Sequence, residues 1–371
     1  MMTPPSPEQP HLIDLKGMPP AALVDLVVRS GEAPYRARQL LSWLYEKDVS
    51  SLEEMTNLPQ SWRTAMRAKV RITRLEELTR RESAVDDTVK FLFAIPGSTS
   101  VESVLISDGR RRTACLSSQV GCPLDCKFCA TGKMGFKGRN LSAGEIVDQL
   151  LRINAWASRR QERVTNVVMM GMGEPLLNYD NVTQALRVMG LEGLGVGGRR
   201  ITVSTAGYVP GIEKLSMEGD LNVGLAISLN ATTDDQRSQI MPINKKFPIA
   251  QLIDAARAYF ERRGRRVTFE YVLMEDITDS DDDARRLAFL TRDIPCKVNL
   301  IPYNELNEEE SQPAGDVVYR RPSAERIRSF RLVLEERAIP SRTVTLRESR
   351  GRDIDAACGQ LYREPAAKEP I

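Results

Sequence analysis

Three cysteines in one short segment constrain this chain more than any other feature. Cys122, Cys126 and Cys129 follow the spacing C-x3-C-x2-C. Three thiolates this close suit an iron–sulfur cluster far better than a disulfide network. A structural zinc ion normally has four closed ligands, and the single histidine, His11, lies in a different region of the chain. The spacing therefore favours a cluster with one open iron over an incomplete zinc site or three buried structural cysteines.

The residue before the last cysteine is aromatic, Phe128, and with it the motif resembles the signature of the radical S-adenosylmethionine (SAM) superfamily. The resemblance implies one 4Fe–4S cluster per chain on the three cysteines, with Phe128 beside the cofactor. The open iron would bind the amino and carboxylate groups of SAM. One electron from the cluster would then cleave the sulfonium and yield a 5′-deoxyadenosyl radical, a reaction carried by the cofactor and shielded by the protein.

The composition is that of an ordinary globular protein. Of the 371 residues 42% are hydrophobic, and no apolar run approaches the ~20 residues of a membrane span. The N-terminus lacks the apolar core of a signal peptide, so we expect a cytoplasmic protein with reduced thiols and no membrane partner. The net charge of +2 does not by itself indicate a nucleic-acid binder. Basic clusters such as 110–112 and 262–266 favour RNA binding only weakly, because any polar chain of this size has some.

The beginning of the chain divides into two segments. Residues 1–11 are rich in proline, and we expect them to be disordered. Residues 12–72 follow the pattern of short helices, the third of which is predicted to contain Met66 and Val70. A small helical domain of this kind could bind RNA or act as a packing cap, and the pattern alone leaves both open.

In the next segment, residues 73–108, the spacing of hydrophobic residues changes from a helical to a strand-like period. The runs 89–95 and 101–106 predict a β-hairpin linker that turns at Pro96 and the glycine after it. Glu102 stands on a largely apolar strand of this hairpin. Its carboxylate is expected either on the solvent face or pointing into a site.

Residues 109–348 alternate between apolar strands and helices. The predicted strands are 114–118, 164–170, 201–205, 223–229, 267–273 and 298–301. Ser142 begins a capping box before one helix, and Gly264 ends another. Six β/α units predict a parallel sheet with right-handed crossovers. This α/β pattern matches the open, partial (β/α)6 barrel of radical SAM enzymes, with the site at the C-terminal strand ends. Residues 349–371 follow as a C-terminal segment.

Polar residues and glycines stand at the predicted strand ends. Gly173 and Glu174 lie in Met-Gly-Met-Gly-Glu-Pro, where glycine allows close backbone approach and a carboxylate can accept an ammonium group. In the superfamily this segment holds the amino group of SAM. Further candidates for binding SAM are Ser204, Ser228, Leu229, Asn230 and Asn304. Each of these could also be an ordinary loop residue, but together they could bond a ribose and a carboxylate.

Three further cysteines lie outside the cluster motif. Cys115 is on the first barrel strand, and Cys296 precedes the last; both could be small buried core residues. Cys358 is followed by glycine near the end of the chain, which is typical of an exposed, reactive thiol.

The wider sequence narrows the resemblance to one family. The segments 114–122, 166–178, 240–246 and 355–360 resemble the RlmN/Cfr family of RNA methyltransferases, over residues 12–361. Asn230 stands where we expect histidine in that pattern. The resemblance implies methylation at C2 of adenosine 2503 in 23S rRNA and of adenosine 37 in tRNAs, and a small N-terminal helical domain that binds RNA.

The resemblance also implies roles for three residues. Cys358, as thiolate, takes a methyl group from one SAM. The radical from a second SAM removes a hydrogen from that methyl group, and the carbon radical adds to C2. Glu102 removes the C2 proton, with Cys115 as a competing candidate. Cys115 then attacks the sulfur of Cys358, which releases the RNA and leaves a transient disulfide. We expect a monomer that depends on an electron donor, flavodoxin-like or similar.

Three alternatives remain open on sequence alone. A Cfr-like enzyme would methylate C8 of the same adenosine with the same two cysteines. A glycyl-radical activase would act on a protein and would need neither Cys115 nor Cys358. An iron–sulfur RNA-binding module would not cleave SAM at all.

Overall fold

The computed structural model describes residues 12–134, 136, 138–191, 194–306, 317–336 and 341–362. The segment 1–11, expected to be disordered, lies outside the described residues, as does the end of the C-terminal segment after residue 362. Among the helices in these ranges, none is long and apolar enough to cross a membrane.

One ten-stranded sheet organises the chain, in the order β12-β11-β10-β9-β8-β7-β6-β5-β4-β3. Its parallel strands are β6 (Arg111–Cys115), β7 (Asn166–Met169), β8 (Ile201–Thr205), β9 (Gly224–Ser228), β10 (Val267–Leu273), β11 (Cys296–Pro302) and β12 (Arg342–Leu346). The partial barrel expected from the sequence is therefore confirmed, with one parallel strand, β12, beyond the six predicted.

The hairpin before the barrel belongs to the same sheet. Strands β3 (Glu77–Glu82), β4 (Val89–Ala94) and β5 (Ser100–Asp108) pair antiparallel, and β5 pairs antiparallel with β6. The segment 73–108 thus extends the barrel sheet at the β6 edge. Its first strand is exposed along its whole length, which is why its sequence, Glu-Leu-Thr-Arg-Arg-Glu, lacks an apolar face.

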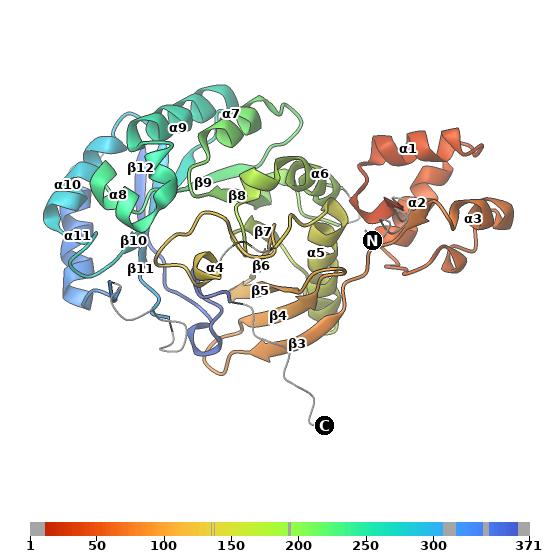
Figure 1. Cartoon of the computed structure of the whole chain (residues 1–371), viewed down its shortest axis with the longest axis horizontal. Helices are drawn as coiled ribbons and strands as arrows, with labels where there is room; N and C mark the ends of the chain where they lie inside the picture. Colours follow the sequence, from red (N-terminus) through yellow and green to blue (C-terminus); the bar gives the residue numbers. More distant parts are fainter. Residues whose placement is uncertain are drawn as a thin grey trace, which may run out of the picture.

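Helices cover the outer face of the curved sheet (Figure 1). They are α5 (Ala143–Ser158), α6 (Tyr179–Met189), α7 (Val209–Met217), α8 (Asp234–Ile240), α9 (Ile249–Arg263), α10 (Asp281–Leu290) and α11 (Ala324–Glu336), while the short α4 (Ala130–Lys133) lies over the strand ends. The Ser142 capping box before α5 and the left-handed Gly264 after α9 are both present. Alternation along β10 sends Phe269 and Tyr271 outward, where Tyr271 stacks on Phe330 of α11 with ring centroids 5.6 Å apart.

The N-terminal module, residues 12–72, packs beside the barrel against α5 and α6 (Figure 1). It contains α1 (Pro20–Arg29), α2 (Arg36–Tyr45) and α3 (Gln60–Met66), with a short parallel pair of β1 (Ile13–Asp14) and β2 (Val70–Arg71). The prediction that Val70 continues the third helix was wrong. The helix ends at Met66, and Val70 instead pairs with Ile13, because this contact between distant residues outweighs local helix propensity.

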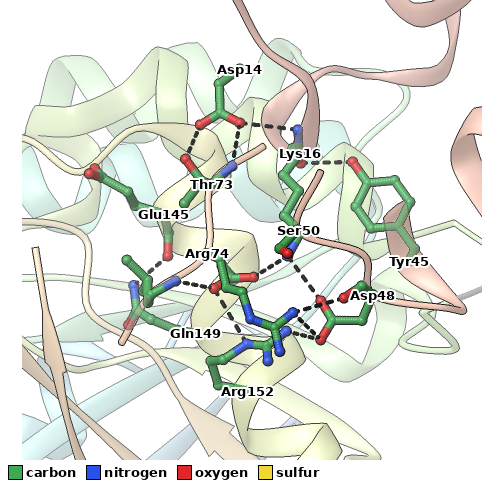
Figure 2. A network of polar contacts seen from close by, with 12 residues as sticks. Asp14, Lys16, Tyr45, Asp48, Ser50, Thr73, Arg74, Glu145, Gln149 and Arg152 are labelled. Atoms are coloured by element: carbon green, nitrogen blue, oxygen red, sulfur yellow. Dashed lines mark hydrogen bonds and ion pairs between the residues drawn. The ribbon is translucent and has the colours of Figure 1, made fainter. Parts of the chain in front are cut away.

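A buried charged network joins this module to the barrel (Figure 2). The Lys16 ammonium, fully buried, is 2.5 Å from Asp148 on α5 and 3.0 Å from Asp48 of the module. Arg152 of α5 also pairs with Asp48, and Asp148 accepts a hydrogen bond from the amide of Leu75 at 2.6 Å. Each buried charge therefore has a partner of opposite sign, as burial requires.

Two glycines allow this close approach. A Cβ on Gly17 would lie 2.6 Å from the backbone nitrogen of Gly144 in α5, and one on Gly144 would overlap Asp14. A side chain at either position would separate the module from the barrel.

Candidate active site

A cavity opens at the C-terminal ends of the parallel strands. The predicted site residues that line it are Cys122, Cys126, Phe128, Cys129, Gly173, Glu174, Ser204, Ser228, Asn230, Asn304 and Cys358. They lie at the C-terminal ends of six different strands or in the segments that follow them, so only the parallel sheet brings them together. This is where the sequence places the site of a partial barrel.

The cysteine loop forms one wall of this cavity. Burial raises the pKa of the thiols of Cys122, to about 12, and of Cys126 and Cys129. Within the described ranges, no three His, Cys, Asp or Glu side chains converge closely enough to hold a single metal ion. Three cysteines that share a cavity without converging on one point suit a four-iron cluster, in which each thiolate binds a different iron, better than a zinc ion.

Glu174 faces the cysteine loop across the cavity. Its carboxylate is only 2% exposed and accepts hydrogen bonds from the amides of Ala206 at 2.8 Å and Leu176 at 3.1 Å. Burial raises its pKa to about 7, and these amides oppose that shift. Gly173 has φ +97°, and a Cβ there would lie 2.5 Å from the side chain of Gln119, so the turn requires glycine.

The polar strand-end residues differ in how free they are to bind a ligand. Asn230 accepts a hydrogen bond from the amide of Val272 at 3.0 Å and donates to the sulfur of Met241. Asn304 donates to the carbonyl of Cys358 at 3.1 Å, and its buried Oδ1 has no hydrogen-bond partner among the described residues. An orphaned acceptor in this cavity fits a bound molecule that donates hydrogen bonds, such as the hydroxyl or amino groups of SAM.

Leu229 does not line the cavity. Its side chain is fully buried in the core, and only its backbone takes part in the strand end, where its carbonyl accepts a hydrogen bond from Arg237 at 2.9 Å. The alternation of a strand explains this, since the neighbours Ser228 and Asn230 face the cavity and Leu229 faces the helices.

Cys115 and Cys358 line a second, smaller cavity that adjoins the first. The two cavities share part of their walls, formed by Cys358, Met170, Ile301 and Arg347. Both cysteines are free thiols. Burial raises the pKa of Cys115 to about 12, the neighbouring Cys358 adds to this shift, and Arg347 opposes it.

The C-terminal segment is tied down on both sides of Cys358. The amide of Ala130 in α4 donates to the carbonyl of Gly359 at 2.8 Å, and the hydroxyl of Thr131 donates to the carbonyl of Leu361 at 2.6 Å. Before the cysteine, the short turn Arg352–Ile354 places Asp353 within 2.8 Å of the hydroxyl of Ser83. These contacts fix Cys358 between the cluster loop and the β3–β4 turn.

Glu102 is not among the residues that line either cysteine cavity. Its carboxylate is 2% exposed and pairs with Lys90 of β4 at 3.0 Å. Lys90 also reaches the carbonyl of Asp355 at 3.3 Å, in the segment that carries Cys358. Solvent exposure, one of the two positions expected from the sequence, is excluded; the other, a carboxylate pointing into a site, stays a prediction, because Glu102 lines neither cysteine cavity.

Two arginines at this site, the buried Arg237 and the half-buried Arg347, escaped the sequence analysis. Arg237 donates to the carbonyls of Leu229, Ala206 and Ser228 and thereby ties the ends of β8 and β9 together. Arg347 follows β12 and lies beside both redox-capable cysteines, and the pKa of its guanidinium is raised mainly by Cys358. Neither had a sequence signal, because arginine is common on surfaces and β12 itself was not predicted.

Comparison with known proteins agrees with this geometry. Residues 116–288 match the radical SAM superfamily, and residues 13–72 match the N-terminal domain of ribosomal RNA large subunit methyltransferases. The chain is 46% identical to the dual-specificity RNA methyltransferase RlmN of Anaeromyxobacter sp. strain Fw109-5, over 99% of this chain and 94% of that one. Identity to the RlmN of Marinobacter nauticus is 43%, over 94% and 92% of the two chains.

A solved structure shows the same architecture. The crystal structure of a radical SAM methyltransferase from Sphaerobacter thermophilus superposes with a TM-score of 0.85 at 42% identity, covering 94% of this chain and 99% of that one. From the cysteine cavity, the partial barrel and these relatives together, the chain belongs to the RlmN family of dual-specificity RNA methyltransferases, within the radical SAM superfamily, which uses a 4Fe–4S cluster and SAM.

Proposed function

We propose that this protein methylates C2 of adenosine in RNA, at position 2503 of 23S rRNA and position 37 of tRNAs, and consumes two SAM per turnover. The observation that carries the proposal is the position of Cys358. It lines the cavity of the three cluster cysteines and also the cavity of Cys115. A thiol in this position can accept a methyl group in the larger cavity. Its sulfur can then be attacked by the thiol of Cys115 from the smaller cavity.

The residues around the larger cavity fit both cofactors. Cys122, Cys126 and Cys129 would hold the cluster, and Phe128 would lie against it. Glu174 would accept the ammonium group of SAM, while Ser204, Ser228, Asn230 and Asn304 offer hydrogen bonds to its ribose and carboxylate. When bound, the cluster supplies the electron that cleaves the sulfonium of SAM.

Cys358 acts as the methyl carrier. Its thiolate attacks the methyl carbon of one SAM; a thioether forms on Cys358, the bond from that carbon to the sulfonium breaks, and S-adenosylhomocysteine leaves. Carbon 2 of adenine has no acidic proton, so direct transfer from SAM is not open to it. The activated S-methyl carbon of Cys358 instead bonds to C2, and RNA and protein become covalently linked.

Cys115 releases the product. Its thiolate attacks the sulfur of Cys358, and a disulfide between the two cysteines forms. The bond from that sulfur to the methylene carbon breaks, its electron pair stays with the methylene carbon and the adenine ring, and the carbon takes up a proton to become the methyl group of the product. An external two-electron reductant then restores both thiols. Because Cys115 is buried with a raised pKa, it is a neutral thiol at neutral pH and must lose its proton before it attacks.

We assign removal of the C2 proton to Glu102, with Cys115 as the competing candidate. Glu102 is connected through Lys90 to Asp355, close to Cys358 in the chain. Cys115 lies in the same cavity as Cys358, but as a neutral thiol it would need a base of its own. Protein–RNA adducts trapped with Glu102→Gln and with Cys115→Ala distinguish these two candidates for the proton acceptor.

The RNA would bind to the N-terminal module and to the basic clusters of the barrel, with the target base extruded from its stack. Affinity that rests on phosphate contacts falls with salt. We further propose that the enzyme is a cytoplasmic monomer and receives electrons from a flavodoxin-like protein.

The deciding experiment is anaerobic reconstitution with iron and sulfide, followed by incubation with SAM, reductant and an rRNA fragment. Mass spectrometry of the digested nucleosides then identifies the product. 2-Methyladenosine supports the proposal, and 8-methyladenosine would replace C2 by C8 with the same residues in the same roles. SAM cleavage without any methylated adenosine would overturn it.

A further inference from the structure

Glu270 is a buried carboxylate to which the reaction above gives no task. It lies on β10 and is 7% exposed. Side chains along a strand point alternately to its two faces. Because Phe269 and Tyr271 face the helices, Glu270 between them points to the inside of the barrel. There it lines the cavity of the cluster cysteines and also a third cavity, of about 690 Å³, in the half of the barrel toward the N-terminal strand ends.

The hydrogen bonds of Glu270 leave one oxygen free. The side-chain amide of Asn299 donates to Oε2 at 2.7 Å, and the orientation of that amide is fixed because its own oxygen accepts from Thr345 at 2.8 Å. Within the described part of the chain, Oε1 of Glu270 accepts no hydrogen bond. Oε1 is also not among the fully buried atoms that lack a partner, so it is open to the cavities that Glu270 lines and can accept a hydrogen bond from a molecule bound there.

The third cavity shares part of its wall with the cavity of the two reactive cysteines. Met170, Ile106, Arg347 and Arg350 line it as well as the cavity of Cys115 and Cys358. Its other walls are polar strand residues, among them Thr113, Asn166, Thr202, Thr268 and Lys297. Glu270 therefore lies between a largely polar space and the cavity that contains Cys358, and no residue of the cluster loop lines that polar space.

We propose that Oε1 of Glu270 accepts a hydrogen bond from the 6-amino group of the adenine that is to be methylated, and so makes the enzyme specific for adenine. This inference rests on the proposed function. A carboxylate attracts an amino group and repels the 6-carbonyl group of guanine or hypoxanthine, in the way acidic side chains select amino groups of bases. Reading a flipped base by its Watson–Crick edge is the usual source of such selectivity.

The adenine of SAM carries the same amino group as the adenine of the RNA. The experiment must therefore show which of these two adenines Glu270 binds. Methylation of Cys358 consumes SAM without any RNA, and it is seen as a mass increase of the protein. Methylation of RNA needs both. A residue that reads the RNA base alters only the second reaction.

The test compares Glu270→Gln with the wild type on RNA that carries either adenosine or inosine at the target position, since both have a hydrogen at C2. We expect the variant to lose about tenfold or more of the preference for adenosine over inosine in kcat/KM. The mass increase at Cys358 and the iron content should be unchanged. Glu348→Gln, the same change at an exposed residue of the same cavity, is the control and should keep the wild-type preference.

Three results would overturn the inference. The first is an unchanged preference for adenosine over inosine in Glu270→Gln. The second is a loss of Cys358 methylation in that variant as large as its loss of RNA methylation, which would assign the carboxylate to SAM. The third is a loss of the preference in Glu348→Gln. If Glu270→Gln does not fold, Glu270→Asp decides instead. It retains the charge but is one methylene shorter, so KM for RNA should rise while inosine stays rejected, and an unchanged KM would contradict the proposal. Wild-type protein that methylates no RNA refutes the proposed function itself, independently of these variants.

Discussion

Cys115 and Cys358 face one cavity, and the guanidinium of Arg347 forms part of its wall. The first cysteine ends β6 and the second follows the last short turn of the chain, so the whole barrel separates them in sequence. A cation beside two thiols stabilises whichever of them is ionised. This arrangement is the basis of the predictions on methyl transfer.

Replacing the methyl carrier should stop the reaction without harming the cluster. Cys358→Ala removes the only sulfur in the proposed carrier position, so RNA methylation should be abolished. Iron content and the visible absorption of the cluster should stay at wild-type levels. Cys296→Ala, a buried cysteine on β11 away from both cavities, is the matched control and should retain activity. Methylation by Cys358→Ala would remove the carrier role.

Without the resolving cysteine, the covalent intermediate should accumulate. Cys115→Ala leaves no thiol to displace the RNA from Cys358, so a protein–RNA adduct should be visible on a denaturing gel after a single turnover. Peptide mapping should place the link at Cys358. Turnover with free product and no adduct would show that Cys115 is dispensable.

The same gel can assign the proton acceptor. If Glu102 removes the C2 proton, Glu102→Gln should accumulate an adduct that retains the C2 hydrogen, measured with RNA deuterated at C2. Iron content must stay at the wild-type level, because the change leaves Lys90 without its carboxylate partner. Normal product release by Glu102→Gln would leave Cys115 as the acceptor.

Burial of Cys115 predicts the pH dependence of its reactivity. Its raised pKa of about 12 means that the thiolate fraction is small at neutral pH and rises about tenfold with each pH unit. In cluster-loaded protein, iodoacetamide should therefore modify Cys358 before Cys115 at pH 7.5. The rate at Cys115 should climb as the pH is raised toward 10. Equal rates for both thiols at pH 7.5 would contradict this.

Arg347 should influence methyl acceptance by Cys358. Arg347→Met keeps much of the side-chain volume but removes the half-buried cation beside the two thiols. We expect methylation of Cys358 to slow by about tenfold, because a thiolate loses its counter-charge. SAM cleavage should persist. The rate of mass increase at Cys358 is the measurement, and a wild-type rate would show that the charge has no part in this step.

The network between the N-terminal module and the barrel should be a large source of stability. Lys16→Met removes the fully buried cation from Asp48 and Asp148 and leaves Arg152 to pair with both, which should cost about 3 kcal/mol in the free energy of unfolding. Asp254→Asn breaks an exposed ion pair with Arg257 and should change the free energy of unfolding by less than about 0.5 kcal/mol. Denaturant unfolding measures both, and similar values for the two variants would show that burial of the pair is unimportant.

Strand β12 and the start of the sheet could not be predicted from local pattern. Arg342–Leu346 is short, has no clear apolar run and buries only Arg342, and Glu77–Glu82 is exposed throughout. Both are strands because a neighbouring strand offers hydrogen bonds along its edge. Such pairing depends on residues distant in sequence, which periodicity does not report.

The sequence by itself determined the cluster motif, the β/α alternation and the choice of Cys115 and Cys358 as the two further cysteines of the site. These are local properties, since spacing within a loop and apolar period within a strand need no partner elsewhere. Tertiary structure decided which strand-end residues face the cavity, and it excluded Leu229 while bringing in Arg347 and Glu270. It also decided that Glu102 pairs with Lys90 and that Cys115 shares a cavity with Cys358. Those relations depend on strand register and on the return of the chain end across the barrel, where long-range packing outweighs every local preference.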